Sequence, residues 1–207
     1  MNSKLYKILT VVALLMLPVI AWGAPSAEQV MAKASSALLK GGGVTATYTY
    51  KQGGQSSSGT LKVKGKKFAI LTKGNSLWYD GKTMWSYDAY ENEVTLTNPT
   101  AGELASMNPY ALVSSYKKDY TVRLVTGKIK GTYNVQLTPK SKNNPVKSAT
   151  LCLRASNYMP VRLDVTSRDG SKNTIIVSDI RTGQSLPDAT FRYPAKSHPK
   201  ARTVDLR

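Results

Sequence analysis

The sequence predicts a mainly β protein of the α+β class, an antiparallel barrel or strongly curved sheet of about ten or eleven short strands with a few short helices. After Val44, apolar and polar residues alternate with a period of two along most of the chain. Gly, Asn, Asp and Pro turns separate these segments at short intervals, and tight turns join antiparallel strands. Because no linker divides the chain, residues 24–207 are predicted to form a single domain.

Residues 1–23 have the pattern of a secretory signal peptide. Lys4 and Lys7 precede an apolar run at residues 8–20, which is too short to cross a bilayer as a stable helix. Ala21 and Gly23 are small residues at the positions that a signal peptidase recognises, so cleavage is expected after Gly23. No cysteine follows the run to carry a lipid. We therefore expect an exported protein without a lipid anchor, located in the periplasm if the source has two membranes.

One amphipathic helix is predicted directly after the signal. Ser26 and Gln29 have the spacing of a capping box, and the glycines at 41–43 end the segment. Its apolar residues recur at helical spacing, namely Val30, Met31, Ala34, Ala37 and Leu38.

Two short helices are predicted where the strand series is interrupted. Thr100 and Glu103 form a second capping-box pattern. Asn108 then places a cap residue before Pro109, which favours the first position of a helix.

The predicted strands form two series around these helices. The first series comprises residues 44–50, 61–64, 68–72, 77–79, 83–87 and 93–97, and the second comprises 120–125, 133–138, 146–153, 161–165 and 173–177. Residues 52–59 are predicted to be a flexible turn, and Asp80-Gly81 to form a tight hairpin turn. After Pro187 we expect only a short segment at 191–193 and a basic tail.

The chain is strongly basic, with 29 Lys and Arg against 12 Asp and Glu and a formal charge of +17. Export argues against a nucleic-acid partner. Lys62 and Lys64 alternate with Leu61 and Val63, as on the solvated face of a strand. A solvated basic surface is the preferred interpretation. The alternative is a weak, salt-dependent attraction to an anionic membrane or an acidic protein.

Catalytic and metal-binding patterns are absent from the sequence. A single cysteine, Cys152, and a single histidine, His198, exclude an internal disulfide and any multi-histidine or multi-cysteine metal site. Asp80 lies in a turn where its side chain can bond the backbone, Glu91 and Glu93 are expected to be solvated, and Cys152 to be a small buried residue. The sequence therefore predicts no enzyme, no metal and no cofactor.

Alternation gives each strand one apolar side. Val161, Leu163 and Val165 share one side of their strand, and polar residues lie between them. The helices could pack on these sides as an ordinary core, or they could form a lid over a cavity. Periodicity does not distinguish the two alternatives.

The segment D-G-K-T-M-W-S-Y at residues 80–87 resembles the D-G-K-T-[LM]-W-x-Y hairpin of the LolA family, the periplasmic outer-membrane lipoprotein carriers. Weaker matches follow in the family's order, namely G-T-L-K-V-K at 59–64 with Phe68, N-P-Y-A-L at 108–112, L-T-P-K at 137–140 and Phe191. The similarity spans essentially the whole chain after the signal.

This resemblance implies an incomplete antiparallel barrel, closed by helices, whose apolar cavity shelters the acyl chains of a lipoprotein. It further implies triacylated lipoproteins as cargo, an inner-membrane ABC transporter as donor, an acceptor at the outer membrane or that membrane itself, and a monomeric carrier. The residues expected to line the cavity are Leu61, Val63, Phe68, Ile70, Trp85, Leu104, Met107, Leu112, Val113, Leu163 and Val165. The lid helices are expected to carry Val30, Leu38, Tyr110 and Leu112.

One position departs from the family pattern. Proteobacterial carriers place an Arg after the Lys that matches Lys64, where it holds the lid shut, and this chain has Gly65 instead. Two other hypotheses remain open from sequence: a lipid- or lipoprotein-binding sensor on the same fold that acts through a protein partner, and a secreted hydrolase that would depend on His198.

Overall fold

The computed structural model describes residues 24–39, 41–100, 103–104, 113, 116–127 and 129–207. Its elements are α2 (Ala27–Leu39), β1 (Gly43–Gln52), β2 (Gln55–Lys64), β3 (Lys67–Thr72), β4 (Asn75–Tyr79), β5 (Met84–Asp88), β6 (Glu93–Thr97), β7 (Tyr120–Val125), β8 (Thr132–Pro139), β9 (Val146–Arg154), β10 (Pro160–Ser167), β11 (Lys172–Gln184), the 3-10 helices η1 (Asp188–Phe191) and η2 (Ala195–Ser197), and β12 (Arg202–Asp205).

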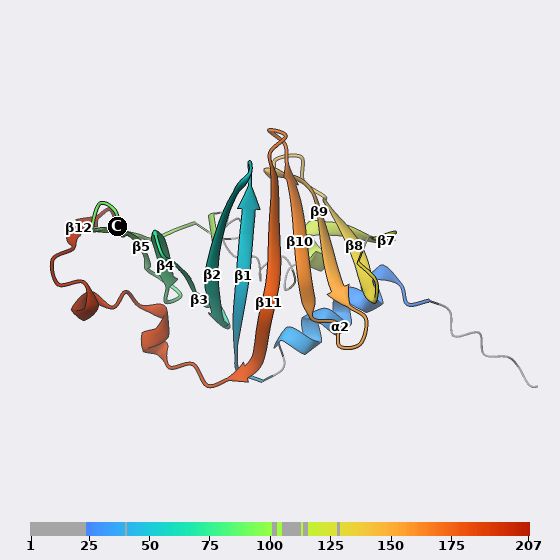
Figure 1. The fold of residues 1–207 in the computed structure, drawn as a ribbon, viewed down its shortest axis with the longest axis horizontal. Helices are drawn as coiled ribbons and strands as arrows, with labels where there is room; N and C mark the ends of the chain where they lie inside the picture. Colours follow the sequence, from blue (N-terminus) through green and yellow to red (C-terminus); the bar gives the residue numbers. More distant parts are fainter. Residues whose placement is uncertain (1–23, 40, 101–102, 105–112, 114–115, 128) are drawn as a thin grey trace, which may run out of the picture.

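These strands form one open, curved sheet in the order β12-β6-β5-β4-β3-β2-β1-β11-β10-β9-β8-β7 (Figure 1). Every neighbouring pair is antiparallel except β12 and β6, which run parallel. The end strands β12 and β7 lie at opposite edges of the sheet, so the barrel is incomplete. The mainly β class and the curved antiparallel sheet are confirmed, with twelve strands in place of the predicted ten or eleven.

Helix α2 begins at the predicted capping box. The Ser26 amide donates to Gln29 Oε1 at 2.9 Å, and the Gln29 amide donates to Ser26 Oγ at 3.2 Å, which satisfies two amides at the helix start. One face of the helix is buried against the sheet and includes Val30, Met31 and Leu38. The second capping box also forms, because the Thr100 amide donates to Glu103 Oε2 at 2.7 Å.

Strand β2 starts earlier than predicted, within the segment expected to be a flexible turn. Only Gly53 and Gly54 form the turn, with φ angles of 55° and 83° that favour glycine. Gly59 pairs directly with Tyr48 of β1. A Cβ at Gly59 would lie 2.7 Å from both the Tyr48 Oη and the Leu71 carbonyl oxygen. The missing side chain at Gly59 therefore lets the Tyr48 ring lie over β2. This packing is one reason why residues with a loop-like composition form a strand here.

Replacing this glycine tests the packing. We expect Gly59→Val to lower the free energy of unfolding by about 1–3 kcal/mol, because the new side chain overlaps a backbone oxygen that cannot move freely. Urea unfolding followed by circular dichroism measures the change. Ser58→Val, at an exposed neighbouring position on the same strand, is the matched control and should stay within about 0.5 kcal/mol of the parent. Equal losses in the two variants would contradict this account of Gly59.

The C-terminal segment is not a tail, which corrects the prediction. It runs along the β2–β6 half of the sheet through η1 and η2 and adds β12 beside β6 (Figure 1). Phe191 is fully buried, and the Tyr193 ring lies 5.5 Å from that of Trp78. The Arg202 guanidinium forms an ion pair with Glu93, so Glu93 is not simply solvated as predicted. The apolar and ionic contacts of this segment explain why it is ordered.

Candidate lipid-binding face

The face of the sheet that α2 covers is called here the inner face. Val30, Met31 and Leu38 of α2 pack with buried residues of β8, β9 and β10, and we call this group the helix cluster. Its sheet residues are Val135, Leu137, Ala149, Leu151, Leu153 and Leu163.

Strand register extends the inner face across the sheet, because directly paired residues point to the same side. Ile180 packs against the helix cluster and pairs with Ala46, which in turn pairs with Leu61. Leu61 then pairs with Ile70. The inner face therefore continues from the helix into the β2–β3 hairpin.

A second cluster lies on this continuation. Val63 pairs with Phe68, Phe68 pairs with Tyr79, and Tyr79 pairs with Met84. These four buried side chains form what we call the hairpin cluster, with the Phe68 and Tyr79 rings 5.4 Å apart. Leu104 packs against the hairpin cluster.

The structure thus places on one face most of the predicted cavity residues that it describes. Leu61, Val63, Phe68 and Ile70 lie in or against the hairpin cluster, and Leu163 and Val165 lie in or against the helix cluster. Val113 is buried in the helix cluster, together with Tyr116. Met107, Tyr110 and Leu112 lie outside the described residues.

Trp85 lies on the opposite, outer face. It pairs with Trp78, which pairs with Ala69, and these residues alternate with the inner-face positions of their strands. Trp85 packs against an outer cluster of Ala69, Trp78, Tyr87, Val94 and Phe191. The structure therefore does not bring Trp85 together with Phe68, because neighbouring residues of a strand point to opposite faces. Sequence reasoning passed over Leu77 and Tyr79, which pair with Ile70 and Phe68 and would have been found from the register of this hairpin.

Between the two clusters the inner face is apolar but only half-buried. We call this region the central patch, and it consists of Tyr48, Leu61, Ile70, Leu77, Val165, Ile175 and Val177. It extends across β4, β3, β2, β1, β11 and β10, which are consecutive neighbours in the sheet. Burial raises the pKa of the Tyr48 phenol, consistent with the apolar surroundings of its ring. The central patch is therefore a contiguous apolar surface that the described residues do not fully cover.

The position that departs from the family pattern lies in the β2–β3 turn. Gly65 has a φ of 59°, a conformation that favours glycine, and among the described residues no atom lies within 4 Å of where a Cβ would be. Its neighbours hold the C-terminal segment instead. Lys64 Nζ donates to the Leu186 carbonyl at 2.8 Å, and Lys67 Nζ lies 2.7 Å from Asp188 Oδ2. The hydrogen bond from Lys67 lowers the pKa of the Asp188 carboxyl.

The outer face of the central strands is polar. Arg162 bonds Asp164 through Nε at 2.7 Å and Nη2 at 2.8 Å, and Thr174 Oγ1 donates to Asp164 Oδ1 at 2.6 Å. The buried thiol of Cys152 donates to Asn134 Oδ1 at 2.9 Å, as fits the predicted buried position. On β10 and β11 the two faces of the sheet therefore differ in chemistry, apolar inside and polar outside, whereas on β3 to β6 the outer face carries the outer cluster.

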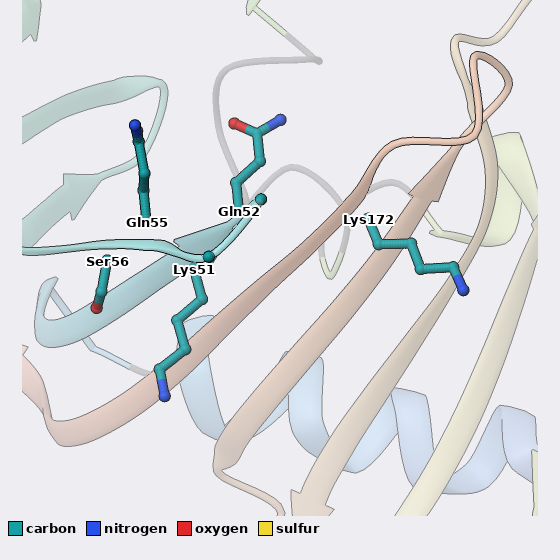
Figure 2. A pocket seen from close by; sticks show the side chains of 7 residues that line it. Lys51, Gln52, Gln55, Ser56 and Lys172 are labelled. Carbon is teal, nitrogen blue, oxygen red and sulfur yellow. The ribbon is translucent and has the colours of Figure 1, made fainter.

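A shallow cleft of about 350 Å³ lies at the tips of the β1–β2 and β10–β11 hairpins. Figure 2 shows its polar lining, which consists of Lys51, Gln52, Gly53, Gly54, Gln55, Ser56 and Lys172. This cleft is open to solvent, and two lysines, two glutamines and a serine lie around it. Within the described ranges no group of His, Cys, Asp and Glu could hold a metal ion, and no helix has the length and apolar character to span a bilayer.

His198 is part of the C-terminal packing. Its ring lies 4.3 Å from that of Tyr87 and 5.6 Å from that of Tyr193. His198 therefore packs against two aromatic rings of the C-terminal region and β5.

Comparison with known proteins agrees with this architecture. The family model described as outer membrane lipoprotein carrier protein LolA matches residues 17–171. The outer-membrane lipoprotein carrier protein of Pasteurella multocida is 26% identical over 211 residues, covering 99% of this chain and 98% of the relative. That of Glaesserella parasuis is 28% identical over 132 residues, covering 63% and 58% of the two chains.

A solved structure shares the fold. An uncharacterized conserved protein from Thermus thermophilus superposes with a TM-score of 0.58 at 13% identity, covering 86% of this chain and 98% of that protein. The family match covers most of the chain, including α2 and ten of the twelve strands in whole, from β1 to β10. The chain therefore belongs to the family of outer membrane lipoprotein carrier proteins, LolA.

Proposed function

We propose that the protein is a periplasmic carrier that binds the acyl chains of triacylated lipoproteins on its inner face and moves them from the inner to the outer membrane. The donor would be an inner-membrane ABC transporter, and the acceptor a protein of the outer membrane or that membrane itself. Residues 1–23 would serve as the signal peptide for export.

The central patch is the observation that carries this proposal. Its apolar side chains lie together on one face of the sheet and are half-buried, while the outer face of β10 and β11 is polar at Arg162, Asp164 and Thr174. An acyl chain laid along Leu61, Ile70 and Ile175 would cover apolar surface that the described residues leave partly open. Burial of such surface is favourable by about 25 cal/mol per Å².

The energetics favour partial burial of the cargo. Each buried methylene contributes about 0.8 kcal/mol, so complete burial of several long chains would exceed the roughly −20 kcal/mol ceiling of non-covalent binding. A carrier must also release its cargo. A half-covered face on an open sheet suits reversible binding better than a closed chamber.

Depletion of the protein in its own cells tests the proposal. Lipoproteins destined for the outer membrane should accumulate in the inner-membrane fraction, and a tagged copy should recover triacylated lipoproteins from the periplasm. A variant with Leu61→Asp should fail to restore sorting, whereas Ser58→Asp, on the other face of β2, should restore it. Normal sorting after depletion would contradict the carrier function and leave a lipid-binding sensor that acts through a protein partner.

A further inference from the structure

The topology collects several turns at one end of the sheet. Because β1, β2 and β7 to β11 are antiparallel neighbours, the β1–β2, β8–β9 and β10–β11 turns and the approach to β7 share that end. Figure 1 shows the tips of β1–β2 and β10–β11 side by side. These turns are far apart in sequence, so their common chemistry is a property of the fold.

These turns carry a concentration of positive charge, which we call the basic rim. All of its cationic side chains are exposed: Lys51, Lys117, Lys118, Lys140, Lys142, Lys147, Arg168 and Lys172. Only two acids, Asp119 and Asp169, lie in the same turns. The Asp169 carboxyl is already engaged by the Ser171 amide at 2.9 Å.

Two side chains of the basic rim bond backbone carbonyls: Lys140 Nζ donates to Lys117 at 2.7 Å, and Arg168 Nε donates to Asn144 at 2.8 Å. Among the residues that the structure describes, no ion pair involves any member of the rim. The opposite end of the sheet differs, because Asp188 pairs with Lys64 and Lys67 there, and Asp80 with Arg192. At the same end, the β3–β4 turn beside the rim carries one more cation, Lys73, and the β5–β6 turn beyond it carries the acids Asp88 and Glu91.

We propose that the basic rim docks the protein on the surface of an anionic phospholipid membrane. The rim extends from β2 to β7, about 30 Å at the usual spacing of strands. Its cationic side chains are exposed, on turns and at the ends of the elements beside them, and the cleft beside Lys51 and Lys172 is open (Figure 2). A wide array of exposed like charges matches a layer of anionic headgroups, which needs no fixed geometry, better than the defined contacts of a folded acidic protein.

The position of the rim connects it to the inner face. Tyr50 and Ile175 pair with one another close to the β1–β2 and β10–β11 turns, on the side that carries the central patch. Docking through the rim would therefore bring one end of the apolar face close to the headgroup layer. Because docking requires no cargo, it can be tested independently of the carrier function.

Vesicle sedimentation of the cargo-free protein tests the proposal. The parent protein should bind vesicles of phosphatidylethanolamine and phosphatidylglycerol, bind vesicles of phosphatidylcholine at least tenfold more weakly, and lose binding as salt is raised. A rim variant with Lys51→Gln, Lys118→Gln, Lys142→Gln and Lys172→Gln should bind the anionic vesicles at least tenfold more weakly than the parent, because each lysine near the surface contributes up to about 1 kcal/mol. Within the described residues these four lysines make no side-chain hydrogen bond or ion pair, so the variant should retain the fold.

The control variant removes the same charge from the opposite end of the sheet. It carries Lys66→Gln, Lys82→Gln, Lys130→Gln and Arg154→Gln, all at exposed positions. We expect this variant to bind anionic vesicles within about twofold of the parent. Equal losses in the two variants would show that net charge alone acts and would overturn the proposal. Failure of the parent to bind anionic vesicles would overturn it in favour of an acidic protein partner.

Discussion

Leu61→Asp is expected to weaken binding of a fluorescent fatty-acid probe by about fiftyfold, because a carboxylate on the central patch removes the contact of roughly three methylenes at about 0.8 kcal/mol each. Leu61 lies on the inner face, pairs with Ile70 and is half-buried. A probe lying along this surface would also have to desolvate the new charge. Fluorescence titration measures the dissociation constant.

Ser58→Asp is the matched control for this prediction. It introduces the same charge on the same strand, at an exposed position that points to the outer face. Probe affinity should stay within about twofold of the parent, and urea unfolding should show that both variants remain folded. A Leu61→Asp variant that is folded and binds the probe normally would exclude the central patch as the acyl site.

Phe191→Ala is expected to lower the free energy of unfolding by about 3–5 kcal/mol, the usual cost of truncating a fully buried Phe. Phe191 is 0% exposed and belongs to the outer cluster with Trp78, Tyr87 and Val94. Its loss would leave a cavity beneath the segment that positions β12. Urea unfolding gives the stability change, and amide hydrogen exchange should show reduced protection of β6 and β12.

An exposed residue of the same segment provides the control. Lys196→Ala in η2 removes an exposed side chain and should change the stability by less than about 0.5 kcal/mol. A Phe191→Ala variant as stable as this control would mean that the C-terminal segment contributes little to the fold.

Local signals in the sequence were reliable where neighbouring residues decide the structure. Both capping boxes form, and the Asp80 carboxylate accepts hydrogen bonds from the Lys82 and Thr83 amides at 3.1 and 3.0 Å, as its turn predicted. Alternation likewise predicted the curved antiparallel sheet. In the capping boxes and the Asp80 turn the interactions span a few residues, so composition and spacing suffice; alternation predicts the strands, although pairings such as β1 with β11 join distant parts of the chain.

The errors came from strand pairing and tertiary contacts, which composition and spacing do not show. The chain after Pro187 has the composition of a tail, and it is ordered by contacts with β4, β5 and β6 that no local pattern shows. Residues 55–59 have the composition of a loop and become part of β2 because they pair with β1. Trp85 matched the family hairpin, yet only the register shows that it points away from Phe68.

Site-specific photocrosslinking tests the central claim, that the inner face receives the acyl chains. A benzoylphenylalanine at Ile175, on the inner face, and one at Thr47, exposed on the outer face, would be compared in cells that produce a triacylated lipoprotein. We predict a crosslink to the lipoprotein from position 175 that disappears when the lipoprotein lacks its acylated cysteine, and none from position 47. Crosslinks of equal yield from both positions, or from position 175 with the unacylated protein, would contradict the claim.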